Sequence, residues 1–242
     1  RNIDLFEKKE KQMQIFDIPI NSKRMETTRI GTFDFPLAVH KNDLKKNVLG
    51  FVNWHWHYEF QLTYVVRGTI SVFFNQQTID LHEGQGIYIN PEVLHMIRDR
   101  YDSDAMFISL DVSPKLLTSF PNSVFERSYV KPVFCSSAAD AVILDPGVFW
   151  QKKILDEAMS IEQDYKSRSF GWELAVSSSL YAIWKELVCH LHEGLAEQDA
   201  PAADGARMRR NQRIKEILSY IREHFTEKIT LDEIAKHLHL ST

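Results

Sequence analysis

The stretch NWHWHYEFQLTYVVRG, residues 53–68, concentrates side chains that can bind ligands or move protons. Two histidines, a glutamate and a glutamine stand at every second position, with mostly aromatic residues between them. Imidazole nitrogens ligate transition metals, and together with amide and carboxylate oxygens they hydrogen-bond hydroxyl groups. The stretch therefore fits a metal site, a pocket for a small polar ligand, or an ordinary half-buried strand.

Alternate side chains of an extended strand point to the same face. One face of this strand would carry His55, His57, Glu59 and Gln61. A single strand over residues 51–67 would be unusually long, so we expect a bend or bulge near residues 57–60. A bend leaves open whether Glu59 and Gln61 share the histidines' pocket.

The surrounding chain must position these residues, and residues 30 to about 112 read as short strands. Runs rich in Val, Ile, Phe and Tyr are separated by turn residues such as Gly68, Asn75-Gln76 and Asn90-Pro91. Because no helical period interrupts these runs, we expect an antiparallel sandwich or small barrel. Residues 113–147 contain four prolines and no clear period, and we expect them to be irregular.

Two helices are predicted after residue 147. The first helix is marked by apolar residues at steps of three and four, namely Trp150, Ile154, Ala158, Ile161 and Tyr165. The second runs from Trp172 to Leu191 and is apolar over most of its circumference, with Leu174, Tyr181, Trp184 and Val188 on its other sides. Such a helix must be covered on two sides, so we expect the barrel on one side and a second subunit on the other. The alternative for the second side is another layer of the same chain.

Composition and charge indicate a globular protein with a basic C-terminal end. The 242 residues carry a net charge of −4, but Arg207–Thr242 hold eight Lys and Arg against five Asp and Glu, a local charge of +3, which leaves −7 on residues 1–206. Two distant cysteines suggest no disulfide framework. The chain shows neither a signal peptide nor a stretch that would span a bilayer, so we expect a cytoplasmic protein with no membrane partner.

The last thirty residues predict two short helices. Ile214, Ile217, Leu218, Ile221 and Phe225 form one amphipathic face. Thr230 with Glu233 three residues later forms a capping box for a second helix, on which Ala235 would let another helix approach closely. Leu240-Ser241 follows as a turn, which is how a helix-turn-helix begins.

The histidine stretch resembles the first motif of the cupin superfamily of β-barrels. Gly50, His55, His57 and Gly68 match that motif, and Gly86, Pro91 and His95 in GQGIYINPEVLH match the second. Gln61 stands where the family has a glutamate, and a neutral amide binds a divalent cation poorly. We therefore expect a pocket without a metal or other cofactor, formed by His55, His57, Glu59, Gln61, His95, Trp56, Tyr88 and His40. The alternative is a divalent metal such as Zn²⁺ or Ni²⁺ on His55, His57 and His95.

The C-terminal end resembles the DNA-binding domain of the AraC/XylS family of transcriptional regulators. The matching positions are Tyr220-Ile221, His224-Phe225, Ile229-Thr230-Leu231, Ile234-Ala235 and Leu238–Ser241. The resemblance implies that a recognition helix would begin after Ser241. Residues expected at the DNA interface are Arg209, Arg210, Arg213, Thr230 and Ser241.

The two resemblances together predict an α+β chain that senses a small effector and binds promoter DNA. The expected parts are an N-terminal arm (1–29), a cupin-like antiparallel jelly-roll barrel (30–147), a helical pair that dimerises the protein (148–195), a linker (196–210) and the beginning of an all-α helix-turn-helix domain (211–242). The effector would be a small molecule such as a sugar, and the protein would be a homodimer and no enzyme. The alternative is a cupin metalloenzyme, a dioxygenase or a sugar isomerase.

Overall fold

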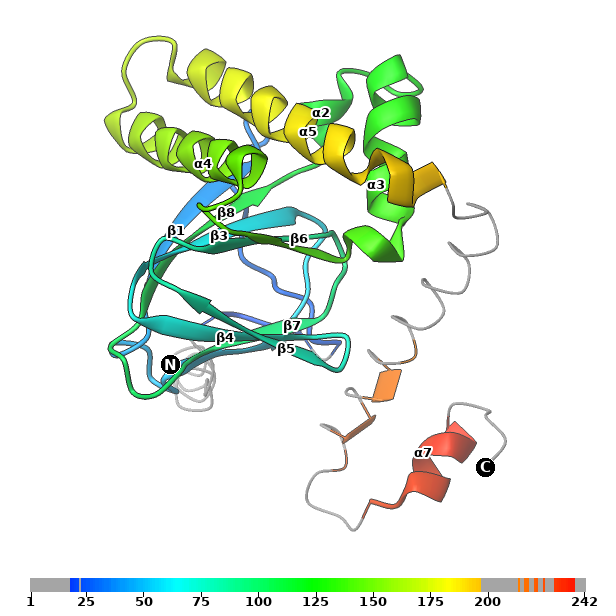
Figure 1. The fold of residues 1–242 in the computed structure, drawn as a ribbon. Helices are drawn as coiled ribbons and strands as arrows, with labels where there is room; N and C mark the ends of the chain where they lie inside the picture. The colour runs from blue at the N-terminus through cyan, green and yellow to red at the C-terminus, as the bar shows by residue number, and fades with distance from the viewer. Residues whose placement is uncertain are drawn as a thin grey trace, which may run out of the picture.

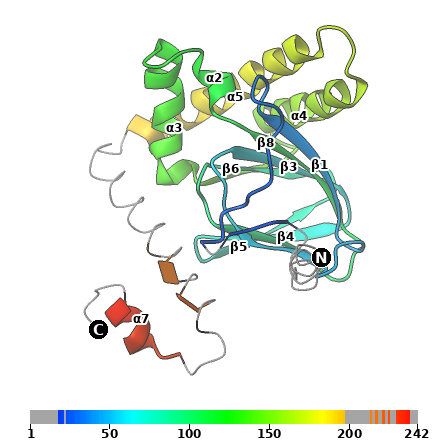
Figure 2. The same cartoon turned by 180° about the vertical axis from the view of Figure 1, so that it is seen from behind.

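The computed structural model describes residues 18–21 and 23–196, the single positions 213, 216, 217, 220, 221 and 224, and residues 229–237. In this part of the chain two antiparallel sheets face each other, and a pair of long helices covers the outer face of one sheet (Figure 1). The view from behind shows the same layers, with the N-terminal segment crossing the open side of the sandwich (Figure 2). The predicted α+β fold with a cupin-like antiparallel barrel is confirmed.

The nine strands of the described residues divide into a sheet of five and a sheet of four. The five-stranded sheet has the order β1-β8-β3-β6-β9 and consists of β1 (Leu37–Asp43), β8 (Met106–Val112), β3 (Phe60–Arg67), β6 (Gly86–Ile89) and β9 (Ala141–Leu144). The four-stranded sheet has the order β2-β7-β4-β5 and consists of β2 (Phe51–His55), β7 (His95–Asp99), β4 (Thr69–Phe74) and β5 (Gln77–His82). Consecutive strands such as β2 and β3 lie in different sheets, so the chain repeatedly crosses the sandwich and closes it.

Strand β3 separates the two hydrophobic cores of the domain. Its residues Phe60, Leu62 and Tyr64 belong to the core between the five-stranded sheet and the helices. The alternate residues Gln61 and Thr63 are also buried and point into the space between the two sheets. The two faces of β3 therefore connect the helix layer with the interior of the sandwich.

The two predicted helices are confirmed as α4 (Phe149–Ser167) and α5 (Trp172–Ala196). The buried side of α4 is formed by Ile154, Leu155, Ala158 and Ile161, which are four of its apolar positions. Arg168 and Gly171 both have positive φ angles, of 49° and 84°, and they reverse the chain between the helices.

Residues 113–147 are more regular than the sequence indicated. They form the short helices α2 (Lys115–Thr118), η1 (Phe125–Val130, a π-helix), α3 (Lys131–Cys135) and η2 (Ser137–Ala139, a 3₁₀ helix), followed by β9. These elements cover part of α5, since the indole Nε1 of Trp184 donates to the carbonyl of Tyr129 at 3.2 Å. The side of α5 that was expected to pack against a partner subunit is thus partly covered by the same chain, although Leu174 and Tyr181 remain exposed.

The described C-terminal residues include α7 (Leu231–His237) with the predicted capping box. The backbone N–H of Thr230 donates to Oε2 of Glu233 at 2.8 Å, and the N–H of Glu233 donates to Oγ1 of Thr230 at 3.3 Å. The linker after Ala196, Arg209, Arg210 and Ser241 fall outside the described residues, and Arg213 is exposed. Within the described residues, no helix has the length and apolarity to cross a membrane.

Candidate functional site

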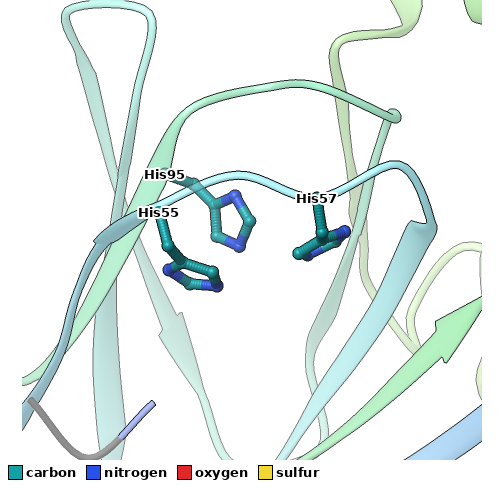
Figure 3. A group of neighbouring side chains, drawn as sticks. All are labelled: His55, His57 and His95. Carbon is teal, nitrogen blue, oxygen red and sulfur yellow. The ribbon is translucent and has the colours of Figure 1, made fainter. Parts of the chain in front are cut away.

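Three histidines meet at one end of the sandwich. His55 is the last residue of β2 and His95 the first of β7, and the two are direct partners in the antiparallel register. The chain leaves β2 after His55, so that His57 lies in the bend between β2 and β3, which the sequence predicted. The three imidazoles converge from these positions (Figure 3), with ring centroids 4.2 Å apart for His55 and His95 and 5.3 Å for His57 and His95.

Each imidazole is oriented by a backbone carbonyl. The Nδ1 atoms of His55, His57 and His95 donate to the carbonyls of Asn53, Glu59 and Val93 at 2.7, 2.9 and 2.9 Å. A carbonyl can only accept, so the proton of the neutral ring is on Nδ1 and the lone pair is on Nε2. The Nε2 atoms of His57 and His95 are buried and have no hydrogen-bond partner.

Burial favours the neutral form of His55 and His95. Desolvation, followed by repulsion from His57, lowers the pKa of His55 to about 4. Desolvation also holds the pKa of His95 well below its usual value, with further repulsion from His55 and His57. The side chains of His55 and His95 are at most 3% exposed, so at neutral pH both rings present lone pairs rather than positive charge.

The donor set fits a divalent cation. One ligand atom from each of His55, His57 and His95 lies within 4.8 Å of the others. Neutral imidazoles whose second nitrogen donates to a backbone carbonyl are the arrangement found at zinc and other transition-metal sites. These three residues would hold such an ion, which would supply a positive charge to the unpartnered Nε2 atoms.

A cavity of about 630 Å³ opens beside the cluster. Its walls come from the N-terminal segment, from β1 and from the inward faces of β3 and β8, and its polar lining includes Glu26, His40, His55, Gln61, Ser109 and Asp111. The amide Oε1 of Gln61 and the carboxylate Oδ1 of Asp111 are buried without a hydrogen-bond partner. Both of these unpartnered atoms are hydrogen-bond acceptors, so the cavity favours an occupant that donates hydrogen bonds or carries positive charge.

Asp111 lies opposite Gln61 in the β3–β8 register and beside His40, whose Nε2 is 3.4 Å from its Oδ2. Burial raises the pKa of Asp111 to about 6, against the lowering effect of His57 and His40. The ionised carboxylate is therefore less favourable in the folded protein than in the unfolded chain.

Asp111→Asn is expected to stabilise the protein by about 1–2 kcal/mol at pH 7.5. A carboxyl whose folded-state pKa is raised destabilises the fold once it ionises, so the gain should shrink below pH 6 and vanish near pH 4. Urea unfolding at several pH values measures this, with Asp102→Asn on an exposed residue as the control. A gain of the same size at pH 4.5 and pH 7.5 would contradict the assignment.

Of the residues predicted to line the pocket, His40, His55 and Gln61 line this cavity, whereas Trp56, His57, Glu59, Tyr88 and His95 do not. His57 and His95 belong to the histidine cluster beside it. Tyr88 is fully buried in the core beneath the helices, because Ile87 and Ile89 take the inward positions of β6. Trp56 packs against the N-terminal segment, and Glu59 lies in the bend, with its Oε2 4.0 Å from Nδ1 of His57. Sequence alternation could not assign the faces of Trp56 and Glu59 because the strand breaks between residues 55 and 60.

Two acidic residues of the site were missed. Glu26 lies in the N-terminal segment and Asp111 near the end of β8. Asp111 is two residues after the buried Ser109 and therefore lies on the same face of β8. Two polar residues on one face are a weak sequence signal for an inward polar face. Glu26 has no sequence signal, because only the path of the chain brings it to the histidines.

The fold and its buried histidine site define a cupin-like ligand-binding domain. Residues 47–146 match the model of the family described as the AraC-like ligand binding domain. The chain is also similar to the protein described as the uncharacterized HTH-type transcriptional regulator YdeC of Bacillus subtilis, at 32% identity over 229 residues, which cover 95% of this chain and 75% of that protein. The chain belongs to the AraC family of helix-turn-helix transcriptional regulators.

Solved structures show more distant similarity. ToxT from Vibrio cholerae, in a structure with a bound unsaturated fatty acid, is 10% identical with a TM-score of 0.42, covering 85% of this chain and 69% of that chain. The AraC-like transcriptional activator CuxR is also 10% identical, with a TM-score of 0.37 and coverage of 76% and 57%.

Proposed function

We propose that this regulator binds a small, donor-rich effector in the cavity beside the histidine cluster, and that binding changes its affinity for promoter DNA. Support comes from one observation above all: Oε1 of Gln61 and Oδ1 of Asp111, two residues that line the cavity, are buried without hydrogen-bond partners. The Nε2 atoms of His57 and His95 also lack partners, in the cluster beside the cavity. A polyhydroxylated molecule such as a carbohydrate donates several hydrogen bonds at once and fits the volume of about 630 Å³.

Strand β3 offers the route from the cavity to the helices. Gln61 faces the cavity, while its neighbour Phe60 lies against Trp184 of α5, with ring centroids 5.5 Å apart. An effector that binds one arrangement of β3 more tightly would shift the position of α5, and with it the spacing of the DNA-binding units in a dimer. The exposed Leu174 and Tyr181 on α5 support a homodimer through this helix.

DNA binding is assigned to the C-terminal end, with Arg209, Arg210, Arg213, Thr230 and Ser241 as the proposed contact residues. The local charge of +3 in residues 207–242 supports this assignment, because Lys and Arg neutralise DNA phosphates. The metalloenzyme alternative has less support, since the relative similar over 95% of the chain is a transcriptional regulator.

Gln61→Ala tests the sensor assignment. The variant is expected to weaken effector binding by roughly three- to tenfold, because one buried hydrogen bond is lost, and to leave DNA affinity without effector unchanged. Candidate sugars are titrated while thermal stability and affinity for the DNA upstream of the protein's own gene are measured. Gln77→Ala, an exposed glutamine on β5, is the matched control.

Two results would contradict the proposal. The first is an effector that binds the wild type and Gln61→Ala with equal affinity, which would mean that the cavity is not its binding site. The second is an affinity for promoter DNA that does not change with salt concentration. It would contradict specific DNA binding, because a protein that contacts phosphates loses affinity steeply as salt concentration rises.

A second candidate effector is a divalent cation, which is favoured by the convergence of one ligand atom from each of His55, His57 and His95. Zn²⁺, Ni²⁺ or Co²⁺ binding to the whole chain, and its effect on DNA affinity, distinguishes this candidate from a carbohydrate.

A further inference from the structure

The N-terminal segment is attached to the backbone of Trp56, the residue between His55 and His57. The N–H of Glu26 donates to the carbonyl of Trp56 at 2.9 Å, and the N–H of Trp56 donates to the carbonyl of Arg24 at 3.1 Å. The indole Nε1 of Trp56 donates to the carbonyl of Lys23 at 2.7 Å. The segment is thus docked directly beside the histidine cluster.

This docking brings the carboxylate of Glu26 to the cluster. The side chain of Glu26 is 8% exposed, and its Oε2 lies 3.8 Å from Nε2 of His55. In the neutral ring, Nδ1 of His55 donates to the carbonyl of Asn53, so Nε2 presents a lone pair to the carboxylate. Two buried acceptors that face each other are stabilised by a cation between them.

A divalent cation on three neutral imidazoles also needs negative charge nearby, because the site is buried. Gln61, which lines the cavity together with His55, has an uncharged amide and supplies no negative charge. Asp111 interacts electrostatically with His57, but its ion pair is with His40, and Glu59 approaches Nδ1 of His57 rather than its Nε2. Among the carboxylates of the described residues, Glu26 is the one with an oxygen within 4.0 Å of an Nε2 atom of the cluster.

We propose that Glu26 of the N-terminal segment supplies the carboxylate ligand of a divalent cation held by His55, His57 and His95. Two ligands of one tetrahedral zinc ion lie about 3.3 Å apart, as follows from bond lengths of about 2.0 Å. The separation of 3.8 Å between Glu26 and His55 therefore needs only a small approach. Cation binding then fixes the N-terminal segment against the barrel, and this regulation rests on the sensor function proposed above.

The test follows Co²⁺ binding by its visible absorption and docking of the segment by tryptic cleavage after Lys23 and Arg24, both measured on the whole chain. Glu26→Gln is expected to raise the Kd for Co²⁺ by about 10- to 100-fold. Co²⁺ is expected to slow cleavage of the wild type about tenfold, as mass action predicts at a ligand concentration of about ten times Kd, and to leave the cleavage of Glu26→Gln unchanged. Glu83→Gln, at an exposed position, is the control for the loss of a carboxylate.

The double variant Glu26→Gln with Gln61→Glu separates the two roles of Glu26. A carboxylate restored on β3 is expected to recover Co²⁺ affinity, while cleavage after Lys23 and Arg24 stays insensitive to Co²⁺. Near-ultraviolet circular dichroism confirms that each variant is folded.

Three results would overturn the inference. They are a wild type that does not bind Co²⁺, a Glu26→Gln variant that binds Co²⁺ as tightly as the wild type, and Co²⁺ binding that leaves wild-type cleavage unchanged. None of them touches the effector dependence of DNA binding, which is measured separately with carbohydrates.

Discussion

Trp184→Ala is expected to lower the free energy of unfolding by about 3–5 kcal/mol, the range for truncating a large buried aromatic residue. Trp184 is 5% exposed and joins α5 to the five-stranded sheet. Its ring lies 5.5 Å from Phe60, 5.3 Å from Phe134 and 6.2 Å from Tyr88, measured between centroids. Alanine would leave a cavity where three elements meet and would also remove the hydrogen bond to the carbonyl of Tyr129.

Chemical denaturation of the wild type and the variant measures this loss. Lys185→Ala, the next residue on α5 and an exposed one, should change stability by less than about 0.5 kcal/mol. Trp184→Phe keeps much of the packing and should retain part of the stability. A loss below 1 kcal/mol for Trp184→Ala would mean that α5 does not pack on the barrel as described.

Gly86→Val is expected to destabilise the fold by about 3 kcal/mol, the upper end for overpacking a filled core. A Cβ atom at Gly86 would stand 2.5 Å from the carbonyl oxygen of Thr63 and 2.8 Å from Cδ2 of Leu155. The first of these atoms belongs to the backbone of β3, which cannot move without disturbing the ladder that carries Gln61. The glycine is therefore needed because β3, β6 and α4 approach one another closely.

The matched control is Gly147→Val. A Cβ atom at Gly147 would meet only Oδ1 of Asp145, at 3.0 Å, and this is the movable end of a side chain at an exposed turn. Its thermal unfolding should remain close to that of the wild type. Equal losses for the two substitutions would show that the cost comes from the valine backbone preference and not from contact with β3.

The histidine site was predictable from the sequence in its core and not at its edges. His55, His57, Gln61 and His95 were identified by their spacing and come together as buried residues. Tyr88 was assigned to the pocket as an aromatic residue that could pack against a ligand, but its side chain lies in the core beneath the helices. The side of the sheet to which a residue points depends on the register of its strand. All four residues of β6 are nonpolar or aromatic and buried, so the strand lacks the alternation of polar and apolar residues that would indicate its inward side.

The irregular segment shows a second limit of sequence patterns. Helices shorter than two turns, such as α2 and α3, contain too few residues to show a period of 3.6, and Pro114 and Pro132 favoured a loop. Their contact with α5 also replaced part of the surface that had been assigned to a second subunit. A pattern can show that a helix face must be covered without showing which part of the chain covers it.

The sequence by itself determined that short strands precede two long helices, the apolar faces of α4 and α5, the capping box at Thr230 and the identity of the three histidines. These features depend on residues a few positions apart, where backbone geometry fixes which side chains share a face. Only the tertiary structure decided that Glu26 faces His55, that Asp111 lies beside His40, and that the carbonyl of Tyr129 accepts a hydrogen bond from Trp184. Those contacts join segments separated by dozens of residues, so they depend on how the whole chain folds back on itself.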